Sequence, residues 1–430
     1  MCLLVAVDRS DNASVRRFGP FGEVPFTVYW AGGLLSNIGT WLQAVVGSVF
    51  VYDRTGSALA VGILNFAAFL PILIFSVWGG MLSDRFDRRH IAVVTHVISL
   101  VVGTGLAAAS FLGLASEVHV IVTAFLLQTS WAIAKPSVIS MIPALVPRAM
   151  LREAVGLNTL QFMVAQLVGP VLATILLGTS GYTLAFAINA ATFIGPILSM
   201  VYLYARGLAG RAPERRATAA PRVGLLEYIR SEPWIASVLV GVVSTSAVIE
   251  FIRTTSPALV SLRLGQPSND TGLIVAAQSV GMVTGILASV PLGRRGFART
   301  MAPVGLVFQL IGLLVASGAT SMALAAPAVA LIGCGFSFCF PVLTSTLQTE
   351  VPDAVRGRLM SIHQMAHLGN RPFAALAAGA ITATYGVPAA LLAGMILAPI
   401  GLVAVRTAWR QLDRRADATQ TLAAEEGVAG

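Results

Sequence analysis

The sequence predicts an all-α membrane protein with twelve transmembrane helices in two six-helix bundles, related to each other by a pseudo-two-fold axis. Hydrophobic residues make up 56% of the 430 residues and charged residues only 11%, and the mean hydropathy is +0.81. A soluble domain carries about 25% charged residues, so this chain cannot cover a water-facing surface. In addition, the chain contains twelve long apolar runs, and its longest polar break divides them six and six.

Each run is long enough to cross a bilayer, because about 20 apolar residues span a hydrocarbon layer that is roughly 30 Å thick. Several runs contain proline, which a membrane bundle tolerates because neighbouring helices satisfy the freed backbone groups. The twelve expected helices cover residues 25–50, 57–82, 90–114, 118–145, 155–178, 182–205, 234–260, 272–292, 301–319, 322–347, 359–384 and 387–409.

The polar segments between these runs predict the domain organisation. A short helix is expected on the membrane surface within residues 224–234, where apolar and charged residues are interspersed. The polar N-terminal residues lack the apolar core of a signal peptide. The expected parts are a tail at 1–24, a bundle at 25–205, a central loop at 206–232, a second bundle at 234–409 and a tail at 410–430.

The basic residues predict the orientation. Most of the 28 Lys and Arg residues fall in the tails, the central loop and alternate short loops, whereas only Arg54 and Arg263 fall in the remaining loops. An excess of positive charge marks the cytoplasmic side. We therefore expect both termini in the cytoplasm of a multi-pass plasma (inner) membrane protein. The net charge of +9 is explained by topology, and no nucleic-acid partner is expected.

Motifs for catalysis or cofactor binding are missing from the sequence. The three cysteines form no CxxC pair, and the chain contains no GxxxxGK[ST], GxSxG or HExxH. His363 and His367 are four residues apart, but no third metal ligand accompanies them, so a structural or pH-sensitive role is favoured. We expect neither an enzyme nor a cofactor, and a proton gradient would supply the energy.

The two halves of the chain share a pattern that suggests duplication of a six-helix unit. A Val-Pro pair precedes the fifth predicted helix of each half, at 146–147 and 351–352. Further along, Gly169-Pro170 is matched by Arg371-Pro372.

The segment GGMLSDRFDRRH at residues 79–90 lies between the second and third predicted helices. It resembles the loop signature of the major facilitator superfamily, except that Asp87 stands where the family has a second glycine. The resemblance implies a latch that holds the two halves together on the cytoplasmic side; the alternative is an ordinary basic loop. The expected latch residues are Gly80, Asp84, Arg85, Arg88 and Arg89.

Gly169 and Pro170 in the fifth helix resemble the core of the family's antiporter signature, although Ala173 and Thr174 replace its paired glycines. They predict either a bend in this helix or close packing against a neighbour. The sequence around these motifs is similar to that of a bacterial exporter branch, which includes enterobactin-type siderophore exporters.

Charged side chains within the membrane are costly and therefore candidates for function. Glu250 is the only acid well inside a predicted helix, and it is the candidate for proton coupling. Lys135 and Arg371 are cavity candidates, and Arg253 is expected to be a partner of Glu250 or a residue at the outer rim. The alternative is a structural ion pair of Glu250 with Arg253 or Arg371.

Neutral polar residues complete the candidate cavity, since the resemblance implies that helices 1, 2, 4, 5, 7, 8, 10 and 11 line it. For any single residue the alternative is a hydrogen bond between helices. These candidates are Asn37, Gln43, Gln128, Trp131, Gln161, Gln166 and Gln278.

The function predicted from these features is proton-coupled export of a small amphipathic molecule, such as a drug, siderophore or metabolite, by alternating access. The expected partners are this small molecule and the lipid bilayer, and the expected protein is a monomer. One alternative is a lipid or lysophospholipid translocator, which would suit an apolar cavity. Another is a membrane sensor that transports nothing.

Overall fold

The structure of the protein is a computed structural model, which describes residues 19–210 and 225–428. Within these residues the chain is helical, and no strand is formed. The α-helices are α2 (Val24–Thr55), α3 (Ala58–Arg85), α4 (Arg88–Phe111), α5 (Glu117–Met141), α6 (Leu151–Thr179), α7 (Gly181–Thr192), α8 (Ile194–Ala205), α9 (Leu225–Ser231), α10 (Pro233–Ala258), α11 (Thr271–Leu292), α12 (Ala298–Gly318), α13 (Met322–Glu350), α14 (Asp353–Leu368), α15 (Arg371–Met395) and α16 (Leu397–Val428).

Short helical turns connect or extend these helices. The 3-10 turns are η1 (Gly19–Gly22), η2 (Ile142–Ala144), η3 (Arg148–Met150) and η5 (Ser268–Asp270). The π-helical turns are η4 (Leu259–Arg263) and η6 (Gly293–Phe297).

The helices supply twelve membrane crossings, as the sequence predicts. Ten stretches of the described residues are long and apolar enough to cross a membrane. Two of them, Ser268–Gly318 with 51 residues and Val355–Asp417 with 63, are too long for one crossing at 1.5 Å of rise per residue. Each turns at a glycine in a left-handed conformation, Gly296 (φ 85°) and Gly386 (φ 84°), and therefore holds two crossings.

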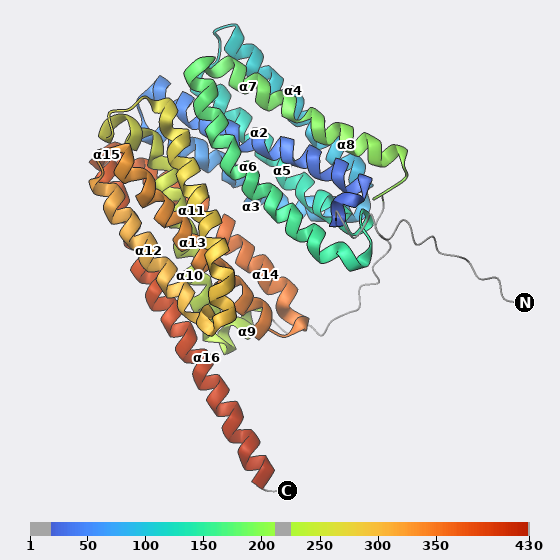
Figure 1. The fold of residues 1–430 in the computed structure, drawn as a ribbon, viewed down its shortest axis with the longest axis vertical. Helices are drawn as coiled ribbons and strands as arrows, with labels where there is room; N and C mark the ends of the chain where they lie inside the picture. The colour runs from blue at the N-terminus through green and yellow to red at the C-terminus, as the bar shows by residue number, and fades with distance from the viewer. Residues whose placement is uncertain (1–18, 211–224, 429–430) are drawn as a thin grey trace, which may run out of the picture. The chain divides into compact units, whose positions relative to one another are not determined.

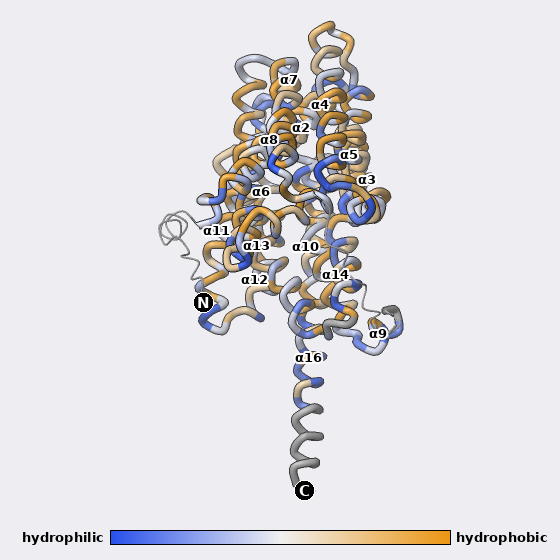
Figure 2. Tube along the Cα trace, turned by 90° about the vertical axis from the view of Figure 1, so that its right-hand side faces the viewer, coloured by the Kyte–Doolittle hydropathy of each residue, from blue (hydrophilic) through white to orange (hydrophobic). Residues whose placement is uncertain are grey.

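The outer surfaces of the helices are apolar and suited to contact with lipid. Large apolar side chains such as Val77, Val101 and Leu198 are 67%, 66% and 61% exposed. Apolar residues run along much of the helices, whereas hydrophilic residues gather toward helix ends (Figure 2). Contiguous apolar surface of this extent would be insoluble in water.

Several helix boundaries differ from the predicted ones. The sixth crossing consists of α7 and α8, which meet at Phe193. The eleventh begins at Asp353 rather than at residue 359, because α14 precedes α15 in the same crossing. The polar sequence after residue 409 continues as helix, so that α16 reaches Val428 and extends beyond the neighbouring helices (Figure 1). A short helix forms within residues 224–234 as α9, and its place on the membrane surface stays a prediction. Most of the predicted central loop and residues 1–18 lie outside the described residues.

The two Val-Pro pairs adopt the same backbone conformation. Pro147 precedes η3 and α6 with φ −56° and ψ 149°, and Pro352 precedes α14 with φ −56° and ψ 145°. Proline fixes φ near −65° and lacks an amide donor, so it suits a position where a helix starts. The repeated sequence therefore corresponds to a repeated local structure.

The chain separates into two compact units. One contains the described parts of 1–47 and 74–216, and the other contains 48–73 and the described parts of 217–430. The first is built on α4 to α8, with a core around Phe26, Met141 and Leu203. The second is built on α10 to α16, with a core around Trp234, Leu306 and Leu343. Adjoining segments of α2 and α3 belong to the second unit, and the six-plus-six division stays a prediction.

Small residues allow the helices of the second unit to approach closely. A Cβ placed on Gly281 of α11 would lie on the carbonyl oxygen of Ala330 in α13, and one on Gly333 of α13 would lie on the carbonyl oxygen of Gln278 in α11. The helices α11, α12 and α13 pack side by side (Figure 1). Without a hydrophobic drive between helices in lipid, close van der Waals contact of this kind holds a bundle together.

The first part of α3 packs along α15 in antiparallel fashion within the second unit. A Cβ on Gly62 would lie 2.8 Å from the carbonyl oxygen of Ala375 and 3.2 Å from Cα of Gly379. Further along α3, the ring centroid of Phe66 lies 6.1 Å from that of Phe373. These pairs run in opposite directions along the two helices and bring the next turn of α3 to the start of α15.

Candidate functional site

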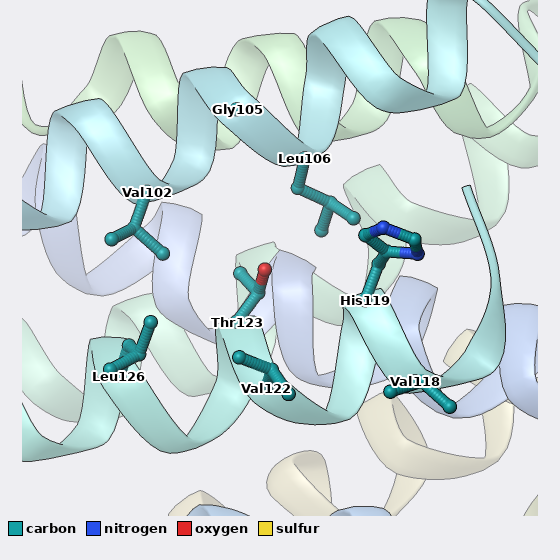
Figure 3. Close-up of a pocket in the computed structure, with 8 residues that line it drawn as sticks. All are labelled: Val102, Gly105, Leu106, Val118, His119, Val122, Thr123 and Leu126. Carbon is teal, nitrogen blue, oxygen red and sulfur yellow. The ribbon is translucent and has the colours of Figure 1, made fainter. Parts of the chain in front are cut away.

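The first unit contains a surface groove that does not coincide with the candidate residues. It lies between α4 and α5, has a volume of about 430 Å³ and is lined mostly by aliphatic side chains, with His119 and Thr123 as its polar members. Figure 3 shows Val102 of α4 facing Leu126 of α5 across it, and Leu106 of α4 facing Thr123 of α5. Its apolar lining suits a hydrocarbon chain from the bilayer rather than a charged ligand.

The charged residues of the second unit gather around Glu250, which lies on α10 and is completely buried. Among the described residues no other carboxylate is buried. An apolar cluster of Ala247 and Phe251 on α10 and Ala374 and Ala378 on α15 lies beside it. A low-dielectric setting of this kind disfavours a charge unless a partner compensates it.

The partners of Glu250 are incomplete. Arg253, three residues along α10, places Nη1 3.7 Å from Oε2, which is an ion pair but too long for a hydrogen bond. Thr254 donates a long hydrogen bond of 3.5 Å to Oε1, and Asn65 of α3 donates one of 3.1 Å to Thr254. Oε2 itself accepts no hydrogen bond from the described residues.

A break in the eleventh crossing positions Arg371. The helix α14 ends at Leu368, and α15 starts at Arg371 with Pro372 in its first turn, where a missing amide donor costs nothing. The Asn370 side chain donates to the carbonyl oxygens of Ala366 and His367, which α14 leaves unpaired at its end. The guanidinium is thereby held at the junction, where it interacts electrostatically with both Glu250 and Arg253.

The ring of Phe69 on α3 joins the two arginines. Cζ of Arg253 lies 5.6 Å from the ring centroid, and Cζ of Arg371 lies 5.3 Å from it. Contacts of this length are favourable cation–π interactions, and they gain strength where water is excluded. We call Glu250, Arg253, Arg371 and Phe69 the charge cluster.

A second group of polar side chains lies on α10, α13 and α14. His367 makes a 2.7 Å hydrogen bond to Ser246, and His363 makes one of 3.1 Å to Thr344. The rings of Phe340 and His367 lie 4.3 Å apart, and Phe336 stacks on Phe340 at 5.1 Å. The two histidines are thus held by hydroxyls and aromatic rings.

In the first unit, Lys135 of α5 lies over the ring of Trp131, with Nζ 4.3 Å from the ring centroid. The two residues are one helical turn apart, so the sequence spacing alone allows this contact. Both side chains are partly exposed, as is Gln128 on the same helix. Lys135 and Glu250 belong to different units.

The neutral candidates of the first unit act as links between helices. Asn37 of α2 donates a hydrogen bond of 3.1 Å to Gln161 of α6, and Gln161 donates to the carbonyl oxygen of Trp30. Gln43 of α2 accepts one of 3.2 Å from Asn189 of α7. Gln166 is partly exposed on α6.

Two further candidates serve mainly in packing. Gln278 of α11, in the second unit, is buried and reaches the carbonyl oxygen of Ile249. The helix α6 runs without interruption from Leu151 to Thr179 through Pro170. A Cβ on Gly169 would lie 2.6 Å from Cβ of Trp41, so this glycine allows α2 and α6 to touch.

The segment 79–90 forms the end of α3 and the start of α4. Asp84 and Arg85 are exposed in the last turn of α3, and no ion pair of Asp84 is found among the described residues. Arg88 donates to the carbonyl oxygen of Ser140 and Arg89 to that of Leu208, each at 3.1 Å. A side chain on Gly80 would meet open space. The latch itself stays a prediction.

Asp87, which stands where the family pattern has a second glycine, makes the strongest interactions in this loop. Its carboxylate accepts a hydrogen bond from the backbone amide of Arg89 and caps α4, and it pairs with the Arg89 guanidinium at 2.7 Å. These contacts lower the pKa of Asp87 below its ordinary value. An aspartate suits this place because the N-terminus of a helix carries partial positive charge.

Replacing Asp87 with alanine should destabilise the first unit by about 1 kcal/mol, the usual cost of a lost N-cap. The Asp87→Asn variant keeps a side-chain cap and loses only the charge, so its loss of stability should be smaller. Because the folded-state pKa is lowered, the stabilisation is present above the ordinary aspartate value and disappears as the pH falls through the folded pKa. Thermal unfolding in detergent between pH 3 and 7 measures this; equal losses in both variants would contradict the cap.

A known family matches nearly the whole of this chain. Its sequence profile, described as transmembrane secretion effector, matches residues 15–428. The chain belongs to this family of major facilitator transporters. It is therefore a multi-pass membrane transporter of small molecules and not an enzyme.

Two relatives share most of their length with this transporter. The multidrug efflux pump Tap of Mycolicibacterium fortuitum is 23% identical over 394 residues, which cover 89% of this chain and 95% of the pump. The staphyloferrin A transporter of Staphylococcus aureus is 22% identical over 356 residues, which cover 78% and 84%.

A solved structure has the same fold. It is a bacterial homologue of the human lysosomal transporter Spinster, in an inward-facing and occupied conformation. The TM-score is 0.73, with 14% identity over 91% of this chain and 97% of that chain. This likeness confirms the major facilitator fold predicted from the sequence.

Some residues of the site were not found by sequence reasoning. Asn65 is a polar residue within an apolar run, a signal that could have placed it among the candidates. Phe69 gave no signal, because one phenylalanine among many in apolar helices is unremarkable until its neighbours are known. At Asp87 the sequence departs from the family pattern, and the structure shows that this residue caps α4.

Proposed function

We propose that this transporter exports a small amphipathic molecule in exchange for protons, with Glu250 as the group that carries the proton. The observation that supports this most is the burial of Glu250, with zero exposure and with incomplete partners on both carboxylate oxygens. A buried carboxyl that is poorly compensated can exist in either protonation state, since burial favours the neutral form and a nearby cation favours the charged one.

The exchange of protons for substrate requires that the protonation state of Glu250 influences the conformation of the transporter. In the charge cluster, the charged form of Glu250 attracts Arg253, whose guanidinium is close enough to respond. Protonation weakens this attraction and releases the arginine for other contacts. A conformational change follows if the two protonation states favour different arrangements of the helices.

The direction of transport is inferred from the relatives. The Tap protein is described as an efflux pump, and Streptococcus pyogenes has a related macrolide efflux protein A that is 25% identical over 154 residues. Export is therefore the direction that we propose here, with the substrate taken from the cytoplasm or the inner leaflet.

The proposal also includes the orientation of the chain in the membrane and its oligomeric state. The basic tails and alternate loops support cytoplasmic termini in the plasma membrane. We take a monomer as the working unit, which transports by alternating access. The polar links on α2, α6 and α7 would hold the first half rigid during this motion.

The proposal is tested with the wild-type protein in inverted vesicles that are acidified inside. Ethidium and fluorescein serve as cationic and anionic amphipathic probes. At least one should accumulate, and nigericin, which dissipates the pH difference, should abolish the accumulation. Accumulation of a probe that nigericin does not reduce would contradict proton coupling. Competition by lysophospholipid at low micromolar concentration would instead favour a lipid translocator.

A further inference from the structure

The charge cluster contains two guanidinium groups and only one carboxylate. Arg253 and Arg371 are both partly buried, with the side chain of Arg253 14% exposed, and both lie beside the ring of Phe69. Glu250 supplies one negative charge, which the two cations share. The described residues of this cluster therefore carry one excess positive charge at membrane depth.

An excess charge in such a place is costly unless something neutralises it. The hydrogen-bonding groups are also incompletely used, because Nε of Arg371 and Oε2 of Glu250 have no hydrogen-bond partner among the described residues. A guanidinium is a fork of donors that matches the two oxygens of a carboxylate. Nε of Arg371 is therefore a donor, on the edge of the guanidinium that pairs with carboxylates, that has no hydrogen-bond partner among the described residues.

Further aromatic side chains lie on the same stretch of α3 and α15. Phe66 lies one turn before Phe69 on α3, and its ring contacts that of Phe373, two residues after Arg371. Phe373 is 61% exposed. A molecule that places an anionic group on the arginines could lay an apolar part against these rings, because aromatic rings offer a large apolar contact area.

We propose that Arg371 and Arg253 form a binding subsite for the carboxylate of an amphipathic organic anion, with Phe66 and Phe373 beside its apolar part. This proposal rests on the proposed transport function and names the substrate class. Glu250 acts as an internal competitor that occupies the arginines in the absence of the anion. A proton on Glu250 therefore frees the arginines for the carboxylate of the anion.

The other titratable group near this part of α10 is His367, which is bonded to Ser246 one turn before Glu250. The elements that pack against Glu250 supply Arg253 from α10 and Arg371 from α15 as its charged neighbours. Competition should follow protonation of Glu250, and a variant of His367 separates its contribution from that of the carboxylate.

Binding is measured with benzoate as the probe, by the thermal stabilisation of purified protein in detergent at constant ionic strength. Sodium chloride and inorganic phosphate are the comparison anions, and pH is varied from 5 to 8. Benzoate should stabilise the protein more than either inorganic anion, and more strongly at low pH. Arg371→Gln should weaken benzoate binding about tenfold or more, the loss expected for one charge-assisted contact.

Matched variants separate the subsite from general effects of charge. Arg54→Gln also removes an arginine, but one that is exposed at the end of α2, so it should bind benzoate like the wild type. Glu250→Gln should bind benzoate more tightly and without pH dependence, because the competitor is gone. Arg371→Lys, which keeps the charge and loses the fork, should bind with intermediate strength, and His367→Gln should keep the pH dependence.

Unchanged benzoate binding in Arg371→Gln would overturn the proposal, as would equal stabilisation by chloride, phosphate and benzoate. If Arg371→Gln does not fold, tighter and pH-independent binding by Glu250→Gln still supports the subsite, and its absence overturns it. Nigericin-sensitive accumulation of ethidium without any benzoate binding would overturn the subsite while leaving the proposed function intact.

Discussion

Replacing Glu250 with glutamine is expected to reduce proton-driven accumulation to the level of vesicles without the protein, while downhill exchange continues. Glutamine has nearly the same shape as a protonated glutamate but cannot bind or release a proton. Because Glu250 is the one buried carboxylate among the described residues, no other acid in that part of the chain is placed to take over. The measurement compares uptake into inverted vesicles with and without a pH gradient.

Two controls make this result interpretable. Asp413→Asn removes an acid from an exposed ion pair with Arg299, where both side chains are 57% exposed, and should transport like the wild type. Thermal unfolding of Glu250→Gln shows whether the variant is folded, since removal of one partner from a buried charge pair is destabilising. Uptake against a gradient at the wild-type rate would reduce Glu250 to a structural partner of Arg253.

Replacing Gly281 with leucine is expected to destabilise the second unit by about 3 kcal/mol or more, at the upper end of the range for overpacking. A Cβ at this position would coincide with the backbone carbonyl of Ala330, which cannot move aside as a flexible side chain could. The helices α11 and α13 would have to separate along a contact that also involves Gly285 and Gly333. This loss is large against a total stability of about 5–15 kcal/mol.

The measurement is the temperature at which half of the detergent-solubilised protein no longer elutes as a monodisperse peak. Gly105→Leu is the matched control, because a Cβ on Gly105 of α4 meets nothing within 4 Å. Its elution should change little. A similar loss in both variants would mean that glycine matters for helix flexibility here, and that close approach of α11 and α13 is not the cause.

Much of the fold could be predicted from local sequence. Hydropathy identifies the crossings because each helix must satisfy its own backbone in lipid, whatever its neighbours are. Two corrections concern places where helix formation does not follow hydropathy. Polar residues continue α16 to Val428, and the eleventh crossing starts early because Pro352 begins a helix before the apolar run.

The candidate site was predictable only in part. The pairing of Glu250 with Arg253 follows from a spacing of three residues in one helix, and the contact of Lys135 with Trp131 follows from a spacing of four. The sequence offered Arg371 as an alternative partner of Glu250, but the contact of Arg371 with Phe69 could not be predicted, since it depends on how α3 and α15 lie against each other. Whether Gln43 or Gln161 lines a cavity or links two helices likewise depends on its neighbours.

The sequence by itself determined the solvent of this protein, the number of its crossings and the identity of the charges placed at depth. Each is a property of composition or of one helix, so it can be read along the chain. The tertiary structure decided which charges meet, which ring joins them and which glycines bring helices together. Such contacts join residues far apart in the chain, and their geometry depends on the packing of whole helices.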